Sequence, residues 1–455
     1  MTTGKLSKPH SSTIDNLPDS ALDNILANLS LDPRSISVIV LVCKRWLAAA
    51  ERSAVLPHRT LVPAVLEEVV TAGQQEPFMR FLTRKSRWVL PRLGIYTGDS
   101  HIFNELIGPA LRVLGAGGGL KHLECMFQGG IPRDLRAITS LTSLGLYSNP
   151  DPTNANECAS WPATQSASLA TLSFLTNLRA LDISVHALTE PFIPPEALSC
   201  LMHLTSLRVG LWGAAAHNGG QQAIALSGTH LAPLTAMRQL DIIHMGLALP
   251  AQQALSSWGN LQQLELLDSQ TITTEQGKGA QQDGGQQGPN SFWQILHRLH
   301  GLTRVAVRGP DPPNSSHLVR QGLSGCSVLQ DLHLEAYTQP ALPSPLPALT
   351  SLYVGGGGLE ALPEGSALLE LRCLTLFHTQ HMAQAPLSLS QLTQLTSLEL
   401  AGIGLQVLRA LPVLSRLHVR EIPPYQVAIP MQPGWDAPIS PQMLEILLPH
   451  VEVMD

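Results

Sequence analysis

The sequence has few aromatic and few charged residues: of its 455 residues, 4% are aromatic and 14% are charged. The formal net charge is -6, so the excess of lysine and arginine that nucleic-acid-binding proteins carry is absent. With 44% hydrophobic residues, the chain is also too apolar for a disordered protein. The composition predicts a folded protein whose core consists mainly of aliphatic side chains.

The sequence also lacks the signatures of disulfide-rich, zinc-finger and membrane proteins. Its six cysteines are far apart and never form a C-x-x-C pair. No apolar stretch follows the polar residues Met1–His10, and no run of about 18 apolar residues occurs anywhere. We therefore expect a soluble protein of the cytoplasm or nucleus, without a secretory signal or a membrane span.

Glycine-rich phosphate loops are absent too. The run Gly115–Leu120 has leucine where a dinucleotide-binding loop needs its third glycine, and Gly277–Gly279 does not continue into a Gly-Lys-Ser/Thr loop. We expect the glycines of Gly115–Leu120 and of Gly355–Gly358 to form turns. No G-x-S-x-G nucleophile motif is present. The sequence predicts no cofactor site and no catalytic site of its own.

Two H-x-x-H pairs are the nearest approach to a metal motif. They are His297 with His300 and His378 with His381, and both lack the glutamate of the H-E-x-x-H zinc motif. Surface or capping histidines account for such pairs more often than metal ligands do. The sequence therefore predicts no metal site.

Leucine, in contrast, is abundant, with 78 residues, and it recurs in a fixed pattern. From residue 90 onward the pattern L-x-x-L-x-L repeats, with Ile, Val, Met or Cys as occasional substitutes, mostly at a spacing of about 20–30 residues. Its first positions are Leu90, Leu120, Leu141, Leu178, Leu204, Met237, Leu261, Leu302, Leu329, Leu349, Leu371, Leu395, Leu414 and Leu448.

Side chains of a strand alternate between its two faces, so positions 4 and 6 of each repeat should point into a core and positions 3, 5 and 7 should point out. Between the strands, segments such as Pro194–Leu201 and Pro386–Leu392 place apolar residues at helical spacing after a proline. The pattern predicts an α/β solenoid, a curved parallel sheet with short outer helices, and it resembles the leucine-rich repeat. The stretch 131–149 resembles the plant-type form.

The ninth position of the repeat departs from the family pattern. The family usually has Asn or Cys there, whereas this chain has Asn only at Asn149 and elsewhere has residues such as His186, Trp212 and Met245. We therefore expect an irregular solenoid in which other donors, or water, satisfy the carbonyl groups of the turns.

The repeat pattern also suggests domain boundaries. The solenoid should cover 89–425, with loop insertions at 150–168, 273–290 and 310–316, where polar, Gly, Gln and Pro residues gather. A C-terminal cap with the last repeat should follow at 426–455, including a helix at 441–448 and a strand at 451–453. Ahead of the solenoid we expect a disordered tail at 1–12 and a helical linker with an N-terminal cap at 51–88.

Residues 13–50 lack the repeat and predict three short helices. Pro18 can open the first helix, where its missing N–H costs nothing, and Leu22, Ile25, Leu26 and Leu29 share one face. The third helix places Ile39, Val42, Cys43, Trp46 and Leu47 on one stripe. About forty residues make too small a core to be stable alone, so another polypeptide or the solenoid should cover part of this apolar surface.

This segment closely resembles the F-box. The resemblance lies in Leu17-Pro18-Asp19, in the apolar positions that follow, and in Val42-Cys43-Lys44-Arg45-Trp46. It implies that the three helices insert into a Skp-type adaptor of a cullin-RING ubiquitin ligase and that the following domain holds the substrate. The implied adaptor-binding residues are Leu17, Pro18, Leu22, Ile25, Leu26, Val42, Cys43 and Trp46.

The resemblance thus predicts a non-enzymatic substrate receptor of an SCF-type ligase, with a Skp-type adaptor and an unknown protein substrate as partners and with no nucleic acid or membrane. The alternative is a leucine-rich-repeat scaffold outside any ligase, whose N-terminal helices only cover the apolar end of the solenoid.

A substrate should contact the outward positions of the strands. Apolar residues and charges at positions 3, 5 and 7 are the candidates, and the charges divide into a mainly acidic first half and a basic second half with Arg304, Arg308, Arg416 and Arg420. The predicted substrate-binding residues are Tyr96, Met126, Tyr147, Asp182, Arg208, Asp241, Ile243, Glu265, Leu267, Arg304, Arg308 and Phe377.

Overall fold

A computed structural model gives the fold of two compact units, Met1–Trp161 and Pro162–Asp455, which are treated separately below. The described residues are 58–61, 92–96, 106–127, 133–148, 169–186, 195–212, 225–226, 228–248, 254–267, 271–272, 291–308, 315–335, 342, 346–355, 368–377, 392, 394–401, 416–419 and 452–454. The predicted F-box at 13–50, the tail at 1–12 and the insertions at 150–168 and 273–290 lie outside them.

The first unit contains a parallel sheet with strand order β1-β2-β3-β4. Its elements are β1 (His58–Leu61), β2 (Arg92–Tyr96), α7 (Gly108–Gly117), β3 (His122–Phe127), the 3₁₀ helix η3 (Arg133–Ala137) and β4 (Ser143–Ser148). Strand β1 falls in the segment predicted as a helical linker and cap. It was missed because Arg59 stands opposite Leu93, where the repeat pattern has leucine.

Helix α7 corrects part of the prediction for the glycine run. Residues Gly115–Gly117 complete the helix instead of forming a turn, and Gly118 ends it in the left-handed conformation at φ 65°, donating its N–H to the carbonyl of Gly115 at 3.1 Å. A left-handed residue after the last helical turn is a position that glycine occupies without strain. The helix buries Leu111 and Leu114.

The second unit contains a longer parallel sheet with strand order β5-β6-β8-β10-β12-β13-β14-β15-β16-β17-β18. The strands are β5 (Ala180–His186), β6 (Ser206–Trp212), β8 (Gln239–Ile243), β10 (Gln263–Leu267), β12 (Arg304–Arg308), β13 (Asp331–Glu335), β14 (Ser351–Gly355), β15 (Cys373–Phe377), β16 (Ser397–Ala401), β17 (Arg416–Val419) and β18 (Glu452–Met454).

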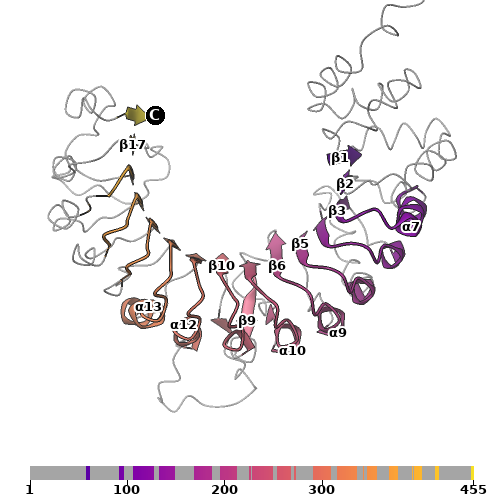
Figure 1. Ribbon diagram of the computed structural model, residues 1–455, viewed down its shortest axis with the longest axis horizontal. Coiled ribbons are helices and arrows are strands. Elements are labelled where there is room, and N and C mark those ends of the chain that lie inside the picture. The colour runs from indigo at the N-terminus through magenta and orange to yellow at the C-terminus, as the bar shows by residue number, and fades with distance from the viewer. Residues whose placement is uncertain are drawn as a thin grey trace, which may run out of the picture. The chain divides into compact units, whose positions relative to one another are not determined.

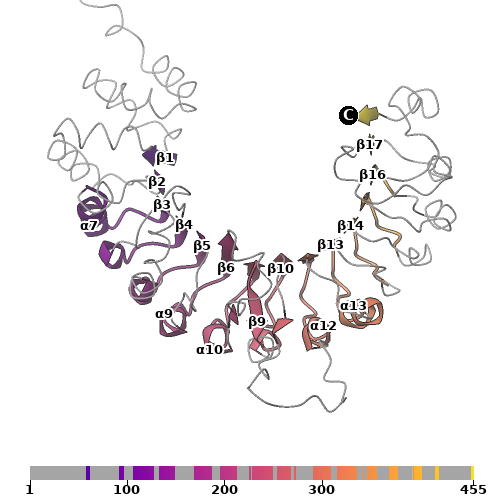
Figure 2. The ribbon, with the colours of Figure 1, turned by 180° about the vertical axis from the view of Figure 1, so that it is seen from behind.

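Short helices connect the strands of the second unit and lie on the outer side of its curved sheet (Figures 1 and 2). They are η4 (Ala170–Phe174), α9 (Pro195–Ser199), α10 (Gly228–Leu231), α12 (Ser291–Leu296) and α13 (Ser315–Leu323). Helix α9 confirms the helix predicted at Pro194–Leu201. Helix α13 begins inside the insertion predicted at 310–316, so the last residues of that segment are helical. The segment Pro386–Leu392 lies outside the described residues except for Leu392.

A small second sheet was not predicted. It has the parallel order β11-β9-β7, from the short strands β7 (Ala225–Leu226), β9 (Gly246–Ala248) and β11 (Thr271–Ile272). Strands of two or three residues are too short to show an alternating pattern, so the sequence carried no usable signal for them.

The core is the predicted leucine ladder. Positions 4 and 6 of the repeats are buried, for example Leu264 and Leu266 on β10, while position 1 and the residues three and six before it are buried as well. Leu172, Leu175 and Leu178 are an example. The N–H of Leu175 donates to the carbonyl of Leu172, and the N–H of Leu178 donates to that of Leu175, both at 2.9 Å. Bonds of this type make one turn every three residues, so the apolar side chains stack on one side.

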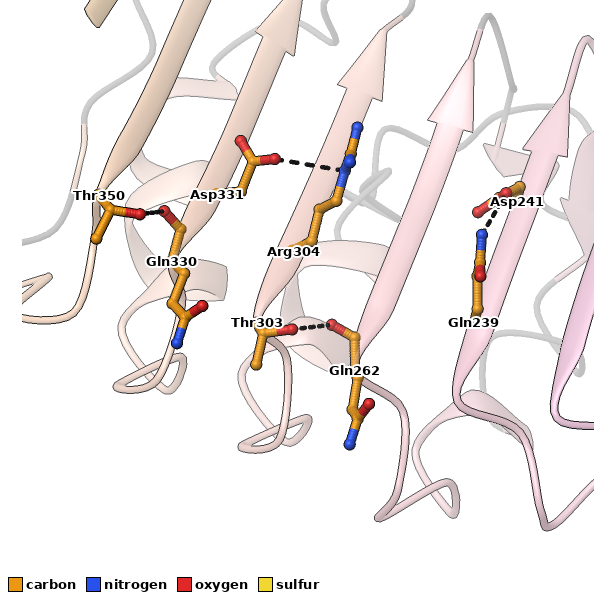
Figure 3. A network of polar contacts seen from close by, with 8 residues as sticks. All are labelled: Gln239, Asp241, Gln262, Thr303, Arg304, Gln330, Asp331 and Thr350. Atoms are coloured by element: carbon orange, nitrogen blue, oxygen red, sulfur yellow. Dashed lines mark hydrogen bonds and ion pairs between the residues drawn. The ribbon is translucent and has the colours of Figure 1, made fainter. Parts of the chain in front are cut away.

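A ladder at position 2 joins neighbouring repeats. The N–H groups of positions 2 and 3 both donate to the position-2 carbonyl of the preceding repeat, as Thr303 and Arg304 do to Gln262 at 2.8 and 3.0 Å. At some repeats a threonine hydroxyl donates to the same carbonyl; Figure 3 shows this bond from Thr303 to Gln262 and from Thr350 to Gln330. This ladder lies at the start of each strand, whereas the family's asparagine at position 9 lies in the turn after it, so the expectation about the carbonyls of those turns stays a prediction.

The last strand has a different register from the predicted one. The pattern starting at Leu448 places Val451 at position 4, whereas Val453 is the residue opposite Leu417, the position-4 residue of β17. The strand is displaced by two residues along its neighbour. A displacement of two residues equals one full period of a strand, so the predicted alternation stays in phase with the neighbouring strand.

Candidate functional site

The inner face of the second unit is the sheet surface formed by positions 3, 5 and 7 of its strands, opposite the helices. Strand β10 illustrates it: Leu264 and Leu266 are buried, whereas Gln263, Glu265 and Leu267 are exposed or partly exposed. A parallel sheet aligns equal positions of neighbouring repeats, so each position forms a row across the strands. These rows are the surface on which the predicted substrate-binding residues of this unit lie.

The position-5 row carries a charged residue on each of the first four strands. Asp182 of β5 lies opposite Arg208 of β6, Arg208 opposite Asp241 of β8, and Asp241 opposite Glu265 of β10. The structure therefore brings these four predicted residues together in one row. These four residues are three carboxylates and one guanidinium, so the net charge of the row is negative.

Asp241 is the buried member of this row, with 5% of its surface exposed. Its Oδ2 accepts a hydrogen bond from Nε2 of Gln239 at 2.9 Å (Figure 3). The pKa of Asp241 is raised, and the largest cause is desolvation by burial. The hydrogen bond from Gln239 opposes this shift. The neighbouring charges act in both directions, since Glu265 and Asp182 raise the pKa and Arg208 lowers it. The ionised carboxylate is therefore held at an energetic cost.

Burial excludes two of the predicted contacts. Asp241 and Ile243, which is 1% exposed, offer almost no surface to a partner in this structure, so the prediction that they bind substrate is wrong. Sequence position could not reveal this, because positions 5 and 7 are outward in every repeat. Arg208 is exposed, and Asp182, Glu265 and Leu267 are partly exposed.

The second half of the inner face is not the basic surface that the sequence suggested. Nε of Arg304 lies 3.5 Å from Oδ2 of Asp331 (Figure 3), and Nε of Arg308 lies 3.7 Å from Oε2 of Glu335. Both acids stand on β13 opposite the arginines of β12. The predicted division into an acidic and a basic half is therefore wrong for these strands. Arg416 is placed only by its backbone on β17, and Arg420 lies outside the described residues.

Sequence reasoning missed a cluster of side chains beside these ion pairs. His333 stacks on Tyr353 with ring centroids 3.8 Å apart and an interplanar angle of 11°, and its Nε2 lies 3.4 Å from Oε2 of Glu335. Both rings stand at position 5 of consecutive repeats, on β13 and β14. Counting position 5 through the second half of the repeats could have found them.

The first unit has its own inner face on β2, β3 and β4. Met126 and Tyr147, opposite one another on β3 and β4, are partly exposed, as predicted for outward positions. A Cβ at Gly145 would lie 3.0 Å from Cε2 of Tyr147, so this glycine leaves room for the tyrosine ring. Tyr96 on β2, and Phe377 on β15 of the second unit, are placed by their backbones, and their side chains lie outside the described residues. Every predicted adaptor-binding residue, backbone included, lies outside the described residues.

The described thiols differ in burial. Cys125 and Cys326 are buried and free, and desolvation raises the pKa of both, to about 11 for Cys326. Cys200 and Cys373 are free and exposed.

Within the described residues, no group of three or more His, Cys, Asp and Glu side chains is arranged to hold a metal ion. No helix among them has the length and hydropathy that crossing a bilayer requires.

These features define the class of the protein. A short strand with an apolar 1-4-6 pattern, a turn and an outer helix or 3₁₀ segment, stacked in parallel register, is the unit of a leucine-rich-repeat solenoid. Such solenoids present an extended inner surface for binding. The chain thus has a leucine-rich-repeat fold suited to protein interaction.

No protein-family model matches the sequence, and no curated protein matches it. Among solved structures, the chain is similar to an internalin (inlF) from Listeria monocytogenes, with 14% identity, a TM-score of 0.45, and coverage of 78% of this chain and 92% of that one. It is similar to TLR13 in its complex with ssRNA13, with 17% identity, a TM-score of 0.39, and coverage of 75% and 44%. For PEPR1 with AtPEP1 the values are 16%, 0.35, 68% and 40%. The chain therefore spans less than half of the TLR13 and PEPR1 chains.

Proposed function

We propose that this chain is the substrate-binding subunit of an SCF-type cullin-RING ubiquitin ligase. One observation carries the proposal: the sequence at 13–50 closely resembles an F-box, and a leucine-rich-repeat fold follows it. In this arrangement the F-box binds the Skp-type adaptor, and the solenoid holds a protein substrate. The subunit performs no bond chemistry. It contributes by holding the substrate near the ubiquitin-charged enzyme, in the cytoplasm or nucleus.

The accessible part of the charged row is the proposed contact for the substrate. Arg208 is exposed between two acidic neighbours, and Glu265 and Leu267 follow two strands further on. A charged centre beside an apolar side chain suits recognition by complementarity, in which charge selects the partner and apolar contact adds affinity. Asp241 and Ile243 of β8 stand in the same rows but are buried, so they add little surface to the contact.

The adaptor arm of the proposal is tested by co-purification of the full chain with a Skp-type adaptor. Leu17→Ala, Pro18→Ala and Trp46→Ala should each abolish or strongly weaken the association. Lys44→Ala is the matched control, because Lys44 lies outside the apolar stripe of the third helix, and it should bind like the wild type.

The same experiment separates the alternative function. A wild-type chain that is folded by circular dichroism and yet never associates with the adaptor would contradict the ligase proposal. The protein would then be a leucine-rich-repeat scaffold outside any ligase, with N-terminal helices that only cap the solenoid.

The substrate arm uses a charge reversal on the inner face. Partners recovered with the wild type should be lost with Arg208→Glu and retained with Arg238→Glu, since Arg238 is exposed at position 2, outside the inner-face rows. Equal recovery by the two variants would show that the substrate binds elsewhere on the chain.

A further inference from the structure

Two exposed histidines lie together directly after helix α12. His297 and His300 have ring centroids 6.4 Å apart and an interplanar angle of 74°. Both rings contact the turn that follows helix α13: Nδ1 of His297 lies 3.2 Å from Oγ of Ser324, and Nδ1 of His300 lies 3.1 Å from the carbonyl oxygen of Gly325. The sequence showed the H-x-x-H spacing, but it could not show that the same turn holds both rings.

These hydrogen bonds determine where each ring carries its proton. A carbonyl oxygen only accepts, so Nδ1 of His300 must be the donor to Gly325. Oγ of Ser324 donates its single proton to the carbonyl of Gln321 at 2.7 Å and therefore accepts from Nδ1 of His297. In the neutral imidazole, a protonated Nδ1 leaves a lone pair on Nε2. Both rings are thus held in the tautomer with an available Nε2.

The turn that holds the rings is tightly packed. A Cβ at Gly325 would collide with the carbonyl oxygen of His297, and one at Gly322 would lie 2.7 Å from the carbonyl oxygen of Trp293. The two glycines therefore allow the end of α13 to lie against α12. This close contact keeps the hydrogen-bond acceptors of both histidines beside the end of α12.

We propose that His297 and His300 form a two-histidine binding site for a borderline divalent transition metal, of which Zn²⁺ is the test case. Metal-binding histidines commonly donate their other ring N–H to a carbonyl or another acceptor, as both rings do here. Two imidazoles on one tetrahedral Zn²⁺ have centroids about 5 Å apart. The rings stand 6.4 Å apart without the metal, so binding requires these exposed side chains to approach one another.

Two protein ligands leave the remaining coordination positions to water or to a ligand from a binding partner. The affinity should accordingly be modest, since no described third His, Cys, Asp or Glu completes the set. The site lies on the helix side of the sheet, apart from the inner-face rows, and the proposal is independent of the ligase function.

Isothermal titration of the full chain with Zn²⁺ tests the proposal. His297→Ala and His300→Ala should each remove one bound equivalent or weaken it at least tenfold, relative to the wild type. His203→Ala is the control, because His203 is an exposed histidine of another repeat, and it should leave this equivalent unchanged. Zn²⁺ bound by the other histidines of the chain is the same in the wild type and the variants, so the difference between them reports on His297 and His300 alone.

A second variant tests the role of the turn. Ser324→Ala keeps both imidazoles but removes the hydrogen-bond acceptor of His297, and it should weaken Zn²⁺ binding about tenfold, as the loss of a hydrogen-bond partner behind a metal-binding histidine commonly does. The proposal is overturned if His297→Ala and His300→Ala, folded by circular dichroism, bind Zn²⁺ with the stoichiometry and affinity of the wild type. Unchanged binding by Ser324→Ala alone would overturn the assigned proton positions.

Discussion

Two regions of the inner face in the second unit use charge differently. On β5 to β10 the position-5 row places Arg208 between Asp182 and Asp241, with Glu265 beyond, and one carboxylate is buried. On β12 and β13 each arginine meets an acid of the neighbouring strand, and both arginines remain about half exposed. The first region keeps a negative excess, whereas the second neutralises itself.

The difference shows that strand register decides the electrostatic character of a solenoid surface. The sequence places Arg304 and Arg308 on one strand, which on its own is basic. The parallel register then sets Asp331 and Glu335 opposite them. A count of charges along the chain cannot anticipate this pairing, but a count along each row of equal positions can.

The largest predicted effect tests whether the two regions share one core. Leu264→Ala on β10 and Leu332→Ala on β13 each remove a buried position-4 side chain, and each should lower the free energy of unfolding by about 2–5 kcal/mol. Urea denaturation measures the loss. Leu267→Ala, on the partly exposed position 7 of β10, is the control and should cost less than about 1 kcal/mol. A marked inequality between the two core variants would mean that the regions differ in packing as well as in charge.

A smaller effect is expected at the buried carboxylate. Because the pKa of Asp241 is raised in the folded chain, its contribution to stability is fully present below the ordinary carboxyl pKa of about 3.9 and is lost as the pH rises through the folded value. Asp241→Asn should therefore stabilise the protein by about 0.5–1 kcal/mol at pH 7, and the gain should vanish below about pH 4.

Chemical denaturation across this pH range measures that gain, and Asn at 241 can still accept the bond from Gln239. Asp331→Asn is the matched variant in the self-neutralised region, where loss of the contact with Arg304 should leave the protein unchanged or slightly less stable. A gain from Asp331→Asn equal to that from Asp241→Asn would remove the distinction between the two regions.

The smallest effect concerns the ion pairs themselves. Arg304 is 51% exposed in its pair with Asp331, so Arg304→Ala should cost only about 0.2–1 kcal/mol, and the cost should shrink in about 1 M salt. Thermal unfolding at low and high salt measures it. A loss that is larger and insensitive to salt would show that the side chain acts through packing.

Much of the fold followed from the sequence because apolar spacing is a local signal. The inward residues at positions 4 and 6 and helix α9 were both predicted. The signal failed where a residue broke the pattern, as Arg59 does on β1, or where strands were too short, as in the β7-β9-β11 sheet.

The candidate site was less predictable because it depends on three-dimensional neighbours. The sequence correctly placed Arg208 and Glu265 on the inner face, but burial of Asp241 and Ile243 arises from packing that position in the repeat does not encode. The stacking of His333 on Tyr353 and the turn beside His297 join residues 20 or more positions apart. The three N-terminal helices, and with them the adaptor-binding residues, stay a prediction.

The position-2 ladder has a consequence for engineering the length of the protein. From Gln262 to Thr396 the ladder alternates between a long polar residue and a threonine whose hydroxyl bonds to the repeat before it. The acceptor in each case is a main-chain carbonyl, which every repeat supplies whatever its side chain at position 2, so the bond depends only on the threonine of the following repeat. Single repeats of this stretch could therefore be deleted or inserted without loss of the hydroxyl bond at any junction whose second repeat has threonine at position 2.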